Sequence, residues 1–332
     1  MNPASCRRKD AAVALVVPVY NVAPYLKECL DSILQQTYED FVIFAVDDGS
    51  TDESGRMLED YAARDSRLIV LHQKNGGLGS ARNTALAAIE ERSGLDYVAF
   101  VDSDDRLDRR YLEKLVSEAE KTSADIVVCG LRRFDERGYW TSNEMPCPKN
   151  ALTKEDFAAL VFGLGEWTQC IGRGGFVVKQ LFRTVLVRGL RFPTGRVIED
   201  EYYTLAAVTQ ASVIRYLPEK LYDYRQRGAS LNNTPDAYEK LAAGRRLCLA
   251  AASGISKSVS DMATLAYLSA LVDVHKTTGI IPEIPAEYLQ VFRTKGRALM
   301  RPKTYRRFWR MHRHPVLARC WWHLLRLVRP RR

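Results

Sequence analysis

The first 130 residues of the chain alternate short β-rich runs with segments in which apolar residues recur at helical spacing. This alternation is typical of βαβ units, in which helices join parallel strands of one sheet. We therefore expect an α/β fold with a mostly parallel central sheet flanked by helices. Its polar loops should lie at the carboxyl ends of the strands, where open α/β sheets bind ligands. The expected strands are Val13–Val17, Phe41–Val46, Leu68–Leu71, Tyr97–Val101 and Ile126–Cys129.

Helices are expected between these strands, with their apolar side chains facing the sheet. The first spans about Tyr25 to Gln35, and the second follows Asp52, a residue type suited to cap a helix N-terminus. The side chains expected to face inward are Leu26, Leu30, Ile33 and Leu34 on the first helix and Met57, Leu58 and Tyr61 on the second.

The second half of the chain is less regular. Residues 132–148 show no clear period, which indicates a loop or an irregular strand, and residues 163–175 are rich in glycine. From Asp236 onward the pattern is helical only. The other expected elements are helices at Lys154–Phe162 and Glu201–Thr209 and strands at Val213–Leu217 and Leu221–Tyr224.

Composition places the chain among ordinary globular proteins, since 46% of its 332 residues are hydrophobic and 27% are charged. The seven cysteines have no paired spacing, so we expect neither a disulfide framework nor a zinc site, and a cytoplasmic location. No secretion signal is expected. No apolar window approaches the roughly 20 residues that cross a bilayer; the best candidate, Ala263–Val274, contains Asp273.

An acidic cluster directly follows the fourth expected strand. Asp102, Asp104 and Asp105 stand within four residues, and carboxylates so close repel one another and cannot be buried unpaired. The segment is either a solvated turn that caps the next helix or a site for a hard divalent cation. In the second case, Asp102 and Asp104 reach one Mg²⁺ or Mn²⁺ that also holds a diphosphate.

Two polar segments end the preceding strands. Asp47–Asp52 follows the second strand, where a carboxylate can accept hydrogen bonds from a uracil-type base or a ribose. Pro18–Asn21 ends the first strand, where Tyr20 can stack on a base. Turn formation and helix capping are the alternatives for the acidic segment, and rim packing is the alternative for the tyrosine.

A glycine-rich turn, Asn75–Asn83, follows the third strand and runs into a helix. Its glycines permit close backbone approach, and the helix N-terminus together with Arg82 favours an anion. The turn lacks both the G-x-G-x-x-G fingerprint and the Gly-Lys-Ser/Thr of a Walker loop. The dehydrogenase and P-loop classes are therefore excluded.

Taken in this order, the four segments resemble the family 2 glycosyltransferases, whose pattern is P-x-Y-N, D-D-G-S-T-D, N-x-G-x-x-x-A-R-N and F-x-D-x-D-D. The match is close over Val13–Leu107 and extends to about Ser230 through Arg191–Pro193, Glu199–Glu201 and Tyr224–Arg227. The resemblance implies the A-type nucleotide-sugar fold, with Mg²⁺ or Mn²⁺ bound at Asp102 and Asp104. It also implies further donor contacts at the following residues: Pro18, Val19, Tyr20 and Asp48 for the nucleoside, and Asn75, Arg82, Asp102, Ser103, Asp104, Arg225 and Arg227 for the diphosphate and sugar.

The family's general base is the aspartate of a Glu-Asp pair ahead of a helix, which corresponds here to Glu199 and Asp200. Such a base takes the proton of the acceptor hydroxyl as its oxygen attacks the anomeric carbon, opposite the departing diphosphate. The alternative is that Glu199–Glu201 only supplies negative charge to the first turn of the helix. One departure is Lys179–Phe182, which reads Lys-Gln-Leu-Phe where members often have Asn-Lys-Leu-Tyr.

The resemblance thus implies an inverting hexosyl- or N-acetylhexosaminyltransferase that uses a nucleoside diphosphate sugar, expected to be UDP-linked. The acceptor would be a hydroxyl of a glycan, polymer or lipid-linked molecule in cell-surface polysaccharide synthesis. We expect a catalytic domain over residues 1–235, with the donor part at 13–130 and the acceptor part at 131–235, and a helical region over 236–332. The alternatives are a sugar-nucleotide nucleotidyltransferase, although its Gly-rich basic loop is missing after the first strand, and a non-catalytic basic adaptor.

The C-terminal part of the chain is strongly basic. Arg293–Arg332 holds 14 lysines and arginines and no aspartate or glutamate, although the net charge of the whole chain is +9. Residues 305–332 combine these cations with tryptophans and leucines, which favours an anionic membrane surface. We therefore expect a peripheral location on the inner face of the cell membrane. Packing on the catalytic domain is one alternative, and nucleic-acid binding is disfavoured because no recognised module accompanies the charge.

Overall fold

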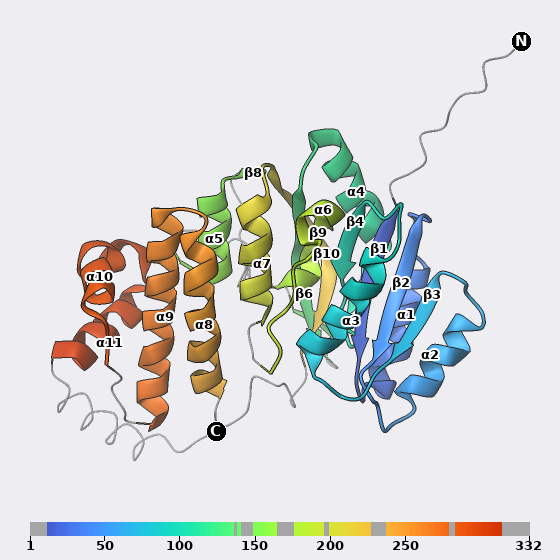
Figure 1. Cartoon of the computed structure of the whole chain (residues 1–332), viewed down its shortest axis with the longest axis horizontal. Coiled ribbons are helices and arrows are strands. Elements are labelled where there is room, and N and C mark those ends of the chain that lie inside the picture. The colour runs from blue at the N-terminus through green and yellow to red at the C-terminus, as the bar shows by residue number, and fades with distance from the viewer. Residues whose placement is uncertain are drawn as a thin grey trace, which may run out of the picture. The chain divides into compact units, whose positions relative to one another are not determined.

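The computed structural model describes residues 12–135, 138–140, 149–164, 176–195, 199–226, 237–278 and 283–313. Its contacts divide the chain into two compact units, whose elements are labelled in Figure 1. The first unit comprises Met1–Thr141, Val177–Thr194 and Ala211–Arg225, and the second comprises Ser142–Phe176, Gly195–Gln210 and Gln226–Arg332.

The first unit is built on a mixed sheet with the strand order β3-β2-β1-β4-β9-β6-β10-β5. The pairings among β1 to β4 are parallel, as is that of β6 with β10, whereas β5, β7 and β9 run antiparallel to their neighbours. Every residue of β1 is buried, as expected of a parallel strand covered on both faces. The strands are β1 (Val13–Val19), β2 (Phe41–Asp47), β3 (Leu68–His72), β4 (Tyr97–Phe100), β5 (Arg106–Leu107), β6 (Ile126–Asp135), β7 (Gly138–Trp140), β9 (Gln180–Arg183) and β10 (Ile214–Arg225).

Helices pack on this sheet in the order that the βαβ pattern predicts. Helix α1 (Ala23–Leu34) contacts α2 and β5, α2 (Ser54–Ala62) contacts β2 and β3, α3 (Leu78–Glu90) contacts β1 and β2, and α4 (Tyr111–Thr122) contacts β6 and β10. The short helix α6 (Thr184–Val187) follows β9. These helices cover the sheet, and open α/β sheets of this kind bind ligands at the carboxyl ends of their strands.

In its described residues, the second unit is helical apart from the short strand β8, and α9 lies at its centre. Helix α9 packs against α5, α8, α10 and α11, while α7 packs against α5 and α8. In the described ranges, no helix combines the length and the apolar character that crossing a membrane requires. The elements are β8 (Ala151–Leu152), α5 (Lys154–Phe162), α7 (Glu199–Gln210), α8 (Ala237–Ser253), α9 (Lys257–Thr278), α10 (Ala286–Leu299) and α11 (Pro302–Arg313).

One side chain fixes a distant segment of the first unit to α3. Asn83 Nδ2 donates to the carbonyl oxygen of Phe192 (2.9 Å), and Asn83 Oδ1 accepts from the Phe192 N–H (2.8 Å). On the next turns of α3, Arg191 pairs with Glu90, and its hydrogen bond lowers the pKa of Glu90 to about 2. Gly79 permits this approach, because a Cβ there would lie 3.0 Å from the carbonyl oxygen of Pro193.

The structure confirms an α/β fold with a central sheet flanked by helices, and it changes three details of the prediction. Strand β6 continues to Asp135, so the start of the range expected to be a loop or an irregular strand is a strand, because those residues pair with β7 and β10. The two strands expected after Val213 form one strand, β10, with irregular register between Leu217 and Tyr222. The sheet is mixed, and β9, which the sequence pattern does not predict, runs antiparallel between β4 and β6 in its middle.

The predicted N-cap of α2 is also wrong. Glu53 occupies the cap position of that helix. The Asp52 carboxylate instead accepts hydrogen bonds from the backbone N–H groups of Ser54 (2.9 Å) and Ala23 (3.0 Å). Asp52 therefore ties the start of α2 to the start of α1, because it can serve two backbone donors at once. Much of the glycine-rich stretch 163–175 lies outside the described residues.

Candidate active site

The acidic turn after β4 gives its three carboxylates different environments. Asp102 and Asp104 are half-buried, whereas Asp105 is 1% exposed. Asp102 Oδ1 accepts a hydrogen bond from Arg82 Nη2 (2.9 Å). The carbonyl oxygen of Asp104 accepts one from Arg225 Nε (2.7 Å). The two carboxylates that the sequence assigns to a cation are thus the two that remain accessible.

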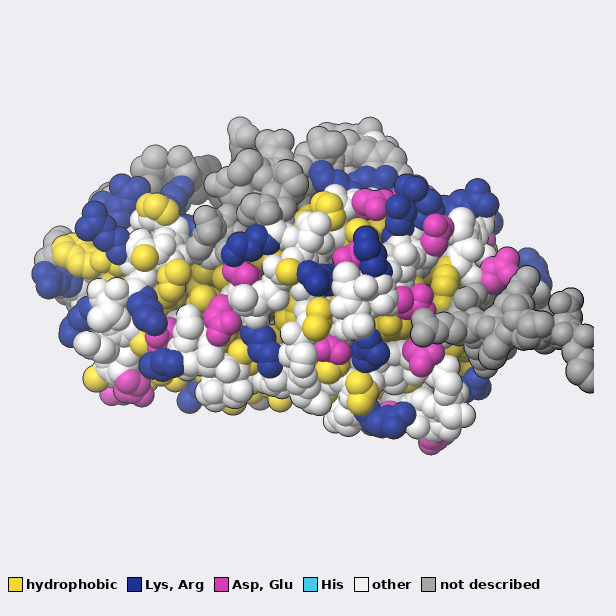
Figure 2. Space-filling model, turned by 90° about the horizontal axis from the view of Figure 1, so that it is seen from above, with side chains coloured by type: hydrophobic (Ala, Val, Ile, Leu, Met, Phe, Trp, Pro, Cys, Tyr) yellow, Lys and Arg dark blue, Asp and Glu magenta, His cyan; other side chains and the backbone are white. Residues whose placement is uncertain are grey.

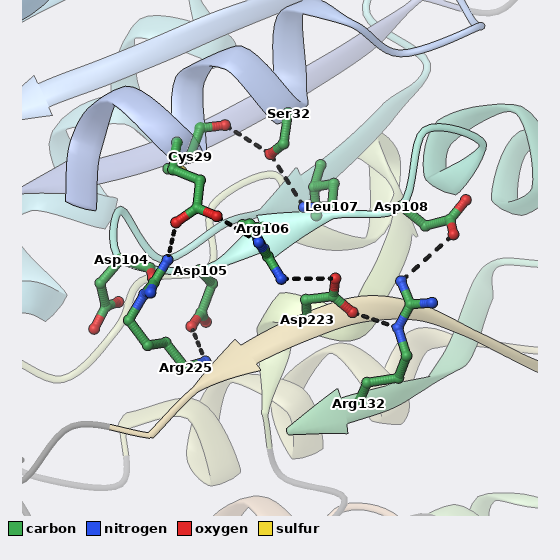
Figure 3. A network of polar contacts seen from close by, with 11 residues as sticks. Cys29, Ser32, Asp104, Asp105, Arg106, Leu107, Asp108, Arg132, Asp223 and Arg225 are labelled. Atoms are coloured by element: carbon green, nitrogen blue, oxygen red, sulfur yellow. Dashed lines mark hydrogen bonds and ion pairs between the residues drawn. The ribbon is translucent and has the colours of Figure 1, made fainter. Parts of the chain in front are cut away.

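Asp105 anchors the end of β10. Tyr222 Oη donates to Asp105 Oδ2 (2.7 Å), and the backbone N–H of Arg225 donates to Asp105 Oδ1 (2.7 Å), the second contact being drawn in Figure 3. Burial raises the pKa of Asp105, and the charges of Asp104 and Asp102 raise it further. Tyr222 Oη also accepts from the backbone N–H of Asp102 (3.2 Å). The third carboxylate is therefore part of the scaffold that shapes the turn.

The donor set of this turn fits a hard divalent ion whose coordination is completed by other oxygen atoms. Among the residues that the structure describes, no three His, Cys, Asp or Glu side chains are grouped closely enough to hold a metal ion. Mg²⁺ is commonly bound by one or two carboxylates together with substrate phosphates and water. The two carboxylates of Asp102 and Asp104 match that arrangement. They do not match a site in which protein side chains supply every ligand.

The Asp48 carboxylate holds the glycine-rich loop against the loop after β2. It accepts hydrogen bonds from the backbone N–H groups of Gly76 (2.8 Å) and Gly77 (2.8 Å) and from Gln73 Nε2 (2.6 Å). The backbone N–H of Gln73 also donates to the carbonyl oxygen of Asp47 (3.0 Å). Asp48 is buried. Besides its expected contact with a nucleoside, Asp48 therefore determines the path of the N-terminal approach to α3.

The end of β1 presents one exposed aromatic ring. Pro18 and Val19 are buried, whereas Tyr20 is 47% exposed. Asn21 has a left-handed backbone (φ 49°), and its Oδ1 accepts from the backbone N–H of Thr51 (2.8 Å). This contact joins the ends of β1 and β2, so the loop that carries Tyr20 is held to the loop that carries Asp48.

The other predicted donor contacts of the first unit differ in accessibility. Arg82 is 1% exposed, and its guanidinium lies over the Phe192 ring, 5.1 Å from the centroid, while it bonds Asp102. Ser103 is buried and Asn75 is exposed. Arg82 thus contacts both Phe192 and Asp102 of the acidic turn. These contacts fix the orientation of its positive charge before any ligand binds.

The predicted base belongs to the second unit. Glu199 and Asp200 are the first two residues of α7, the former buried and the latter half-buried. Glu201 pairs with Arg245 on α8 (3.3 Å), which gives this third acid a structural role. Arg227 lies outside the described residues.

Sequence reasoning missed two side chains that shape the site. The sequence pattern does not distinguish Gln73 from other loop residues, and it indicates only a strand position for Tyr222. Alternation along β10 gives a weak signal for Tyr222, which is fully buried although it carries a hydroxyl. A buried tyrosine normally needs a hydrogen-bond partner, but the sequence does not say that the partner is Asp105.

Several known proteins are similar to this chain in sequence or in fold. The family model described as Glycosyl transferase family 2 matches residues 14–167. The glycosyltransferase GlyG of Streptococcus pneumoniae serotype 4 is 31% identical over 229 residues, which is 67% of this chain and 73% of GlyG. The chain belongs to glycosyltransferase family 2.

Two further proteins are similar to this chain, one in sequence and one in fold. The uncharacterized glycosyltransferase EpsJ of Bacillus subtilis is 37% identical over 227 residues, which is 67% of this chain and 63% of EpsJ. The chain therefore spans less than two thirds of that relative. The crystal structure of S. aureus TarS 1-349 in complex with UDP-GlcNAc is similar in fold, with a TM-score of 0.65 and 21% identity over 97% of this chain and 93% of that one.

A histidine links Asp47, at the end of β2, to Glu59 on α2. His72, at the end of β3, has Nδ1 at 3.0 Å from Asp47 Oδ2 and Nε2 at 2.7 Å from Glu59 Oε1. The hydrogen bonds to Glu59 and Asp47 raise the pKa of His72 above its ordinary value of 6.5. Asp47 Oδ1 in turn accepts from the backbone N–H of Ser50 (2.9 Å). Protonation of His72 therefore supports the turn that precedes α2.

This linkage predicts a pH-dependent stability. Because the folded-state pKa of His72 is raised, its contribution is fully present below about pH 6.5 and is lost as the pH rises through the folded-state value. We expect the melting temperature of His72→Gln to fall further below that of the wild type at about pH 6 than at about pH 9. Differential scanning fluorimetry at the two pH values checks this, with Glu59→Gln as a companion that should weaken the same dependence. An equal difference at both pH values would contradict it.

Proposed function

We propose that this family 2 member is an inverting glycosyltransferase that moves a sugar from a UDP-linked donor to a hydroxyl of a glycan, polymer or lipid-linked acceptor in cell-surface polysaccharide synthesis. The observation that carries the proposal is the acidic turn after β4, in which Asp102 and Asp104 stay accessible while Asp105 is buried. The structural neighbour TarS is described with UDP-GlcNAc, which favours a uridine nucleotide and an N-acetylhexosamine among the possible donors. Membership of the family disfavours the nucleotidyltransferase and adaptor alternatives.

The donor would lie along the ends of β1, β2 and β4. Tyr20, whose ring is exposed, would stack on the base, and Asp48, beside Pro18 and Val19, would accept from the base or the ribose. Arg82 and Asn75 would contact the diphosphate. Because Arg82 is buried and already oriented, its charge can act on the diphosphate with little reorganisation.

Asp102 and Asp104 would hold Mg²⁺ or Mn²⁺. A bound ion of this kind supplies positive charge that stabilises the negative charge developing on the departing diphosphate. Without it, the two carboxylates repel the diphosphate. The expected consequence is that donor binding depends on the metal.

The first prediction tests the metal site. We expect Asp104→Asn to reduce turnover by more than about 10²-fold, since even outer-shell partners of a metal typically contribute 10- to 100-fold. Release of UDP from UDP-GlcNAc, with and without Mn²⁺, measures the effect. Asp60→Asn, on the exposed surface of α2, is the matched control and should behave as the wild type. Wild-type turnover that persists in EDTA would exclude the metal.

The proposed general base is Asp200. Its support is the position of the Glu199-Asp200 pair at the start of α7 and after the Arg191–Pro193 segment, together with the half-buried state of Asp200. Since Glu201 is engaged with Arg245, it is a poorer candidate for proton transfer. The carboxylate of Asp200 would take the proton of the acceptor hydroxyl while that oxygen attacks the anomeric carbon.

The second prediction concerns this base. Asp200→Asn keeps the shape of the side chain but cannot accept the proton, so we expect kcat to fall by about 10² to 10⁴-fold. Donor affinity should change little, the pattern of an interaction made chiefly in the transition state. Steady-state kinetics and calorimetry with the donor separate the two effects. Glu199→Gln should be less damaging. Near-normal kcat in Asp200→Asn, or a product whose anomeric configuration is retained by NMR, would disprove the assignment.

A peripheral membrane location is the second part of the proposal, and helix α11 supports it. Arg306, Trp309, Arg310 and Arg313 are exposed and recur at helical spacing, whereas Phe308 is buried. The guanidinium of Arg313 lies 5.3 Å from the centroid of the Trp309 ring. Figure 2 shows lysine and arginine side chains gathered over the α10 and α11 end of the second unit. A basic helix face with an exposed tryptophan suits an anionic headgroup layer. Residues 314–332, the rest of the basic segment, lie outside the described residues.

The third prediction tests this face without truncation, because removing α11 would also remove the buried Phe308 and uncover Phe292 of α10, whose ring centroid lies 4.4 Å from that of Phe308. Each cation near an anionic leaflet contributes about 1 kcal/mol, so Arg306→Gln with Arg310→Gln should weaken binding to phosphatidylserine vesicles by roughly 30-fold. The matched control is Arg64→Gln with Lys121→Gln, two exposed cations of the first unit. Flotation measures binding. Equal flotation of the two double variants would refute the membrane role of this face.

A further inference from the structure

One face of α1 holds the backbone of the acidic turn and of the strand that follows it. Cys29 Sγ donates to the carbonyl oxygen of Asp102 (3.6 Å). The backbone N–H of Leu107 donates to Ser32 Oγ (3.1 Å), one helical turn further along. These contacts fix the turn from its backbone side, and Figure 3 shows the Asp104 carboxylate turned away from α1.

Glu28, on the same face of α1, reaches the turn through two arginines. One carboxylate oxygen accepts from Arg225 Nη2 and the other from Arg106 Nη1. Arg225 Nε donates to the carbonyl oxygen of Asp104 (2.7 Å), and Arg106 is the residue that follows Asp105 directly. Glu28 is thereby connected to the middle of the acidic turn and to its end.

The two arginines share Glu28 as a negative partner, and Arg106 Nη2 also lies 3.8 Å from Asp223 Oδ2. Their guanidinium carbons lie 4.1 Å (Arg106) and 4.3 Å (Arg225) from the centroid of the same ring, that of Phe134. Two cations on one ring repel each other, and Glu28 offsets that repulsion with one oxygen for each. Only 12% of the Arg225 side chain is exposed, and it also lies over the Tyr25 ring (5.0 Å). Its hydrogen bond to Asp104 therefore has a defined direction as long as Glu28 is charged.

We propose that Glu28 is a positioning residue of the metal and donor site. Through Arg225 and Arg106 it fixes the backbone of the acidic turn, so that the carboxylates of Asp102 and Asp104 are held for a single divalent ion. This role rests on the proposed function, because it needs an ion at that turn. Residues that orient metal ligands without touching the ion typically change its affinity by 10- to 100-fold. Glu28 is partly exposed, so the lower end of that range is expected.

The test compares Glu28→Gln with Asp31→Asn. Both replace an acid by its amide on α1, and Asp31 pairs with Lys27 and accepts from Tyr61, away from the acidic turn. Binding of Mn²⁺ in the presence of UDP, followed by electron paramagnetic resonance, gives the dissociation constant of the ion. Thermal unfolding without metal reports on the scaffold alone. We expect Glu28→Gln to raise the Mn²⁺ dissociation constant about tenfold, and Asp31→Asn to leave it unchanged.

A second variant guards against a general loss of structure. Arg225→Lys keeps the positive charge but lacks the Nε donor to Asp104, so it should also raise the Mn²⁺ dissociation constant, and saturating Mn²⁺ should restore UDP release in Glu28→Gln. Unchanged Mn²⁺ affinity in Glu28→Gln, or a loss that a lower metal-free melting temperature fully explains, would overturn the role of Glu28 alone. A wild type that fails to bind Mn²⁺ with UDP would overturn both this role and the proposed metal site.

Discussion

Repulsion among the three aspartates that follow β4 is the constraint around which the first unit is arranged. Burying Asp105 removes one carboxylate from the surface, and this is tolerable only because Tyr222 and the backbone of Arg225 donate to both of its oxygens. Leaving a buried hydrogen-bonding group without its partner typically costs about 1–3 kcal/mol. The end of β10 must therefore meet the end of β4, although more than 100 residues separate them in the sequence.

As a result, the three aspartates within these four residues have different roles in the site. Asp105 organises the turn, and Asp102 and Asp104 keep accessible oxygens for a ligand. Arg82 bonds Asp102 from the side of α3, and Arg225 bonds the backbone of Asp104 from the end of β10. A binding site held in this way by helices and strands is better defined than one built on loops alone. Two carboxylates alone bind a metal ion weakly, and they are sufficient where the diphosphate of the donor supplies further oxygen ligands.

At the ends of β1 and β2, where the nucleoside is proposed to bind, a buried carboxylate also organises the surrounding loops. Asp48 accepts hydrogen bonds from Gln73 and from two backbone N–H groups of the glycine-rich loop, so the loops after β2 and β3 are joined to each other. Asn21 extends this connection to the end of β1. Substitutions of Asp48 would therefore affect loop structure and nucleotide binding together, and their kinetic effects need a stability measurement beside them.

The sequence by itself determined the βαβ order of the first unit, the placement of polar segments at strand ends, and the family, because these follow from periodicity and from short motifs such as Asp102–Asp105. It also identified the helix Lys154–Phe162, whose capping residues are adjacent in the chain. The tertiary structure alone decided the antiparallel entry of β9, since a four-residue strand forms only where neighbours offer hydrogen bonds. It alone decided which aspartate of the turn is buried, and it brought Glu28 to Arg225, because partners 197 positions apart leave no local pattern to read.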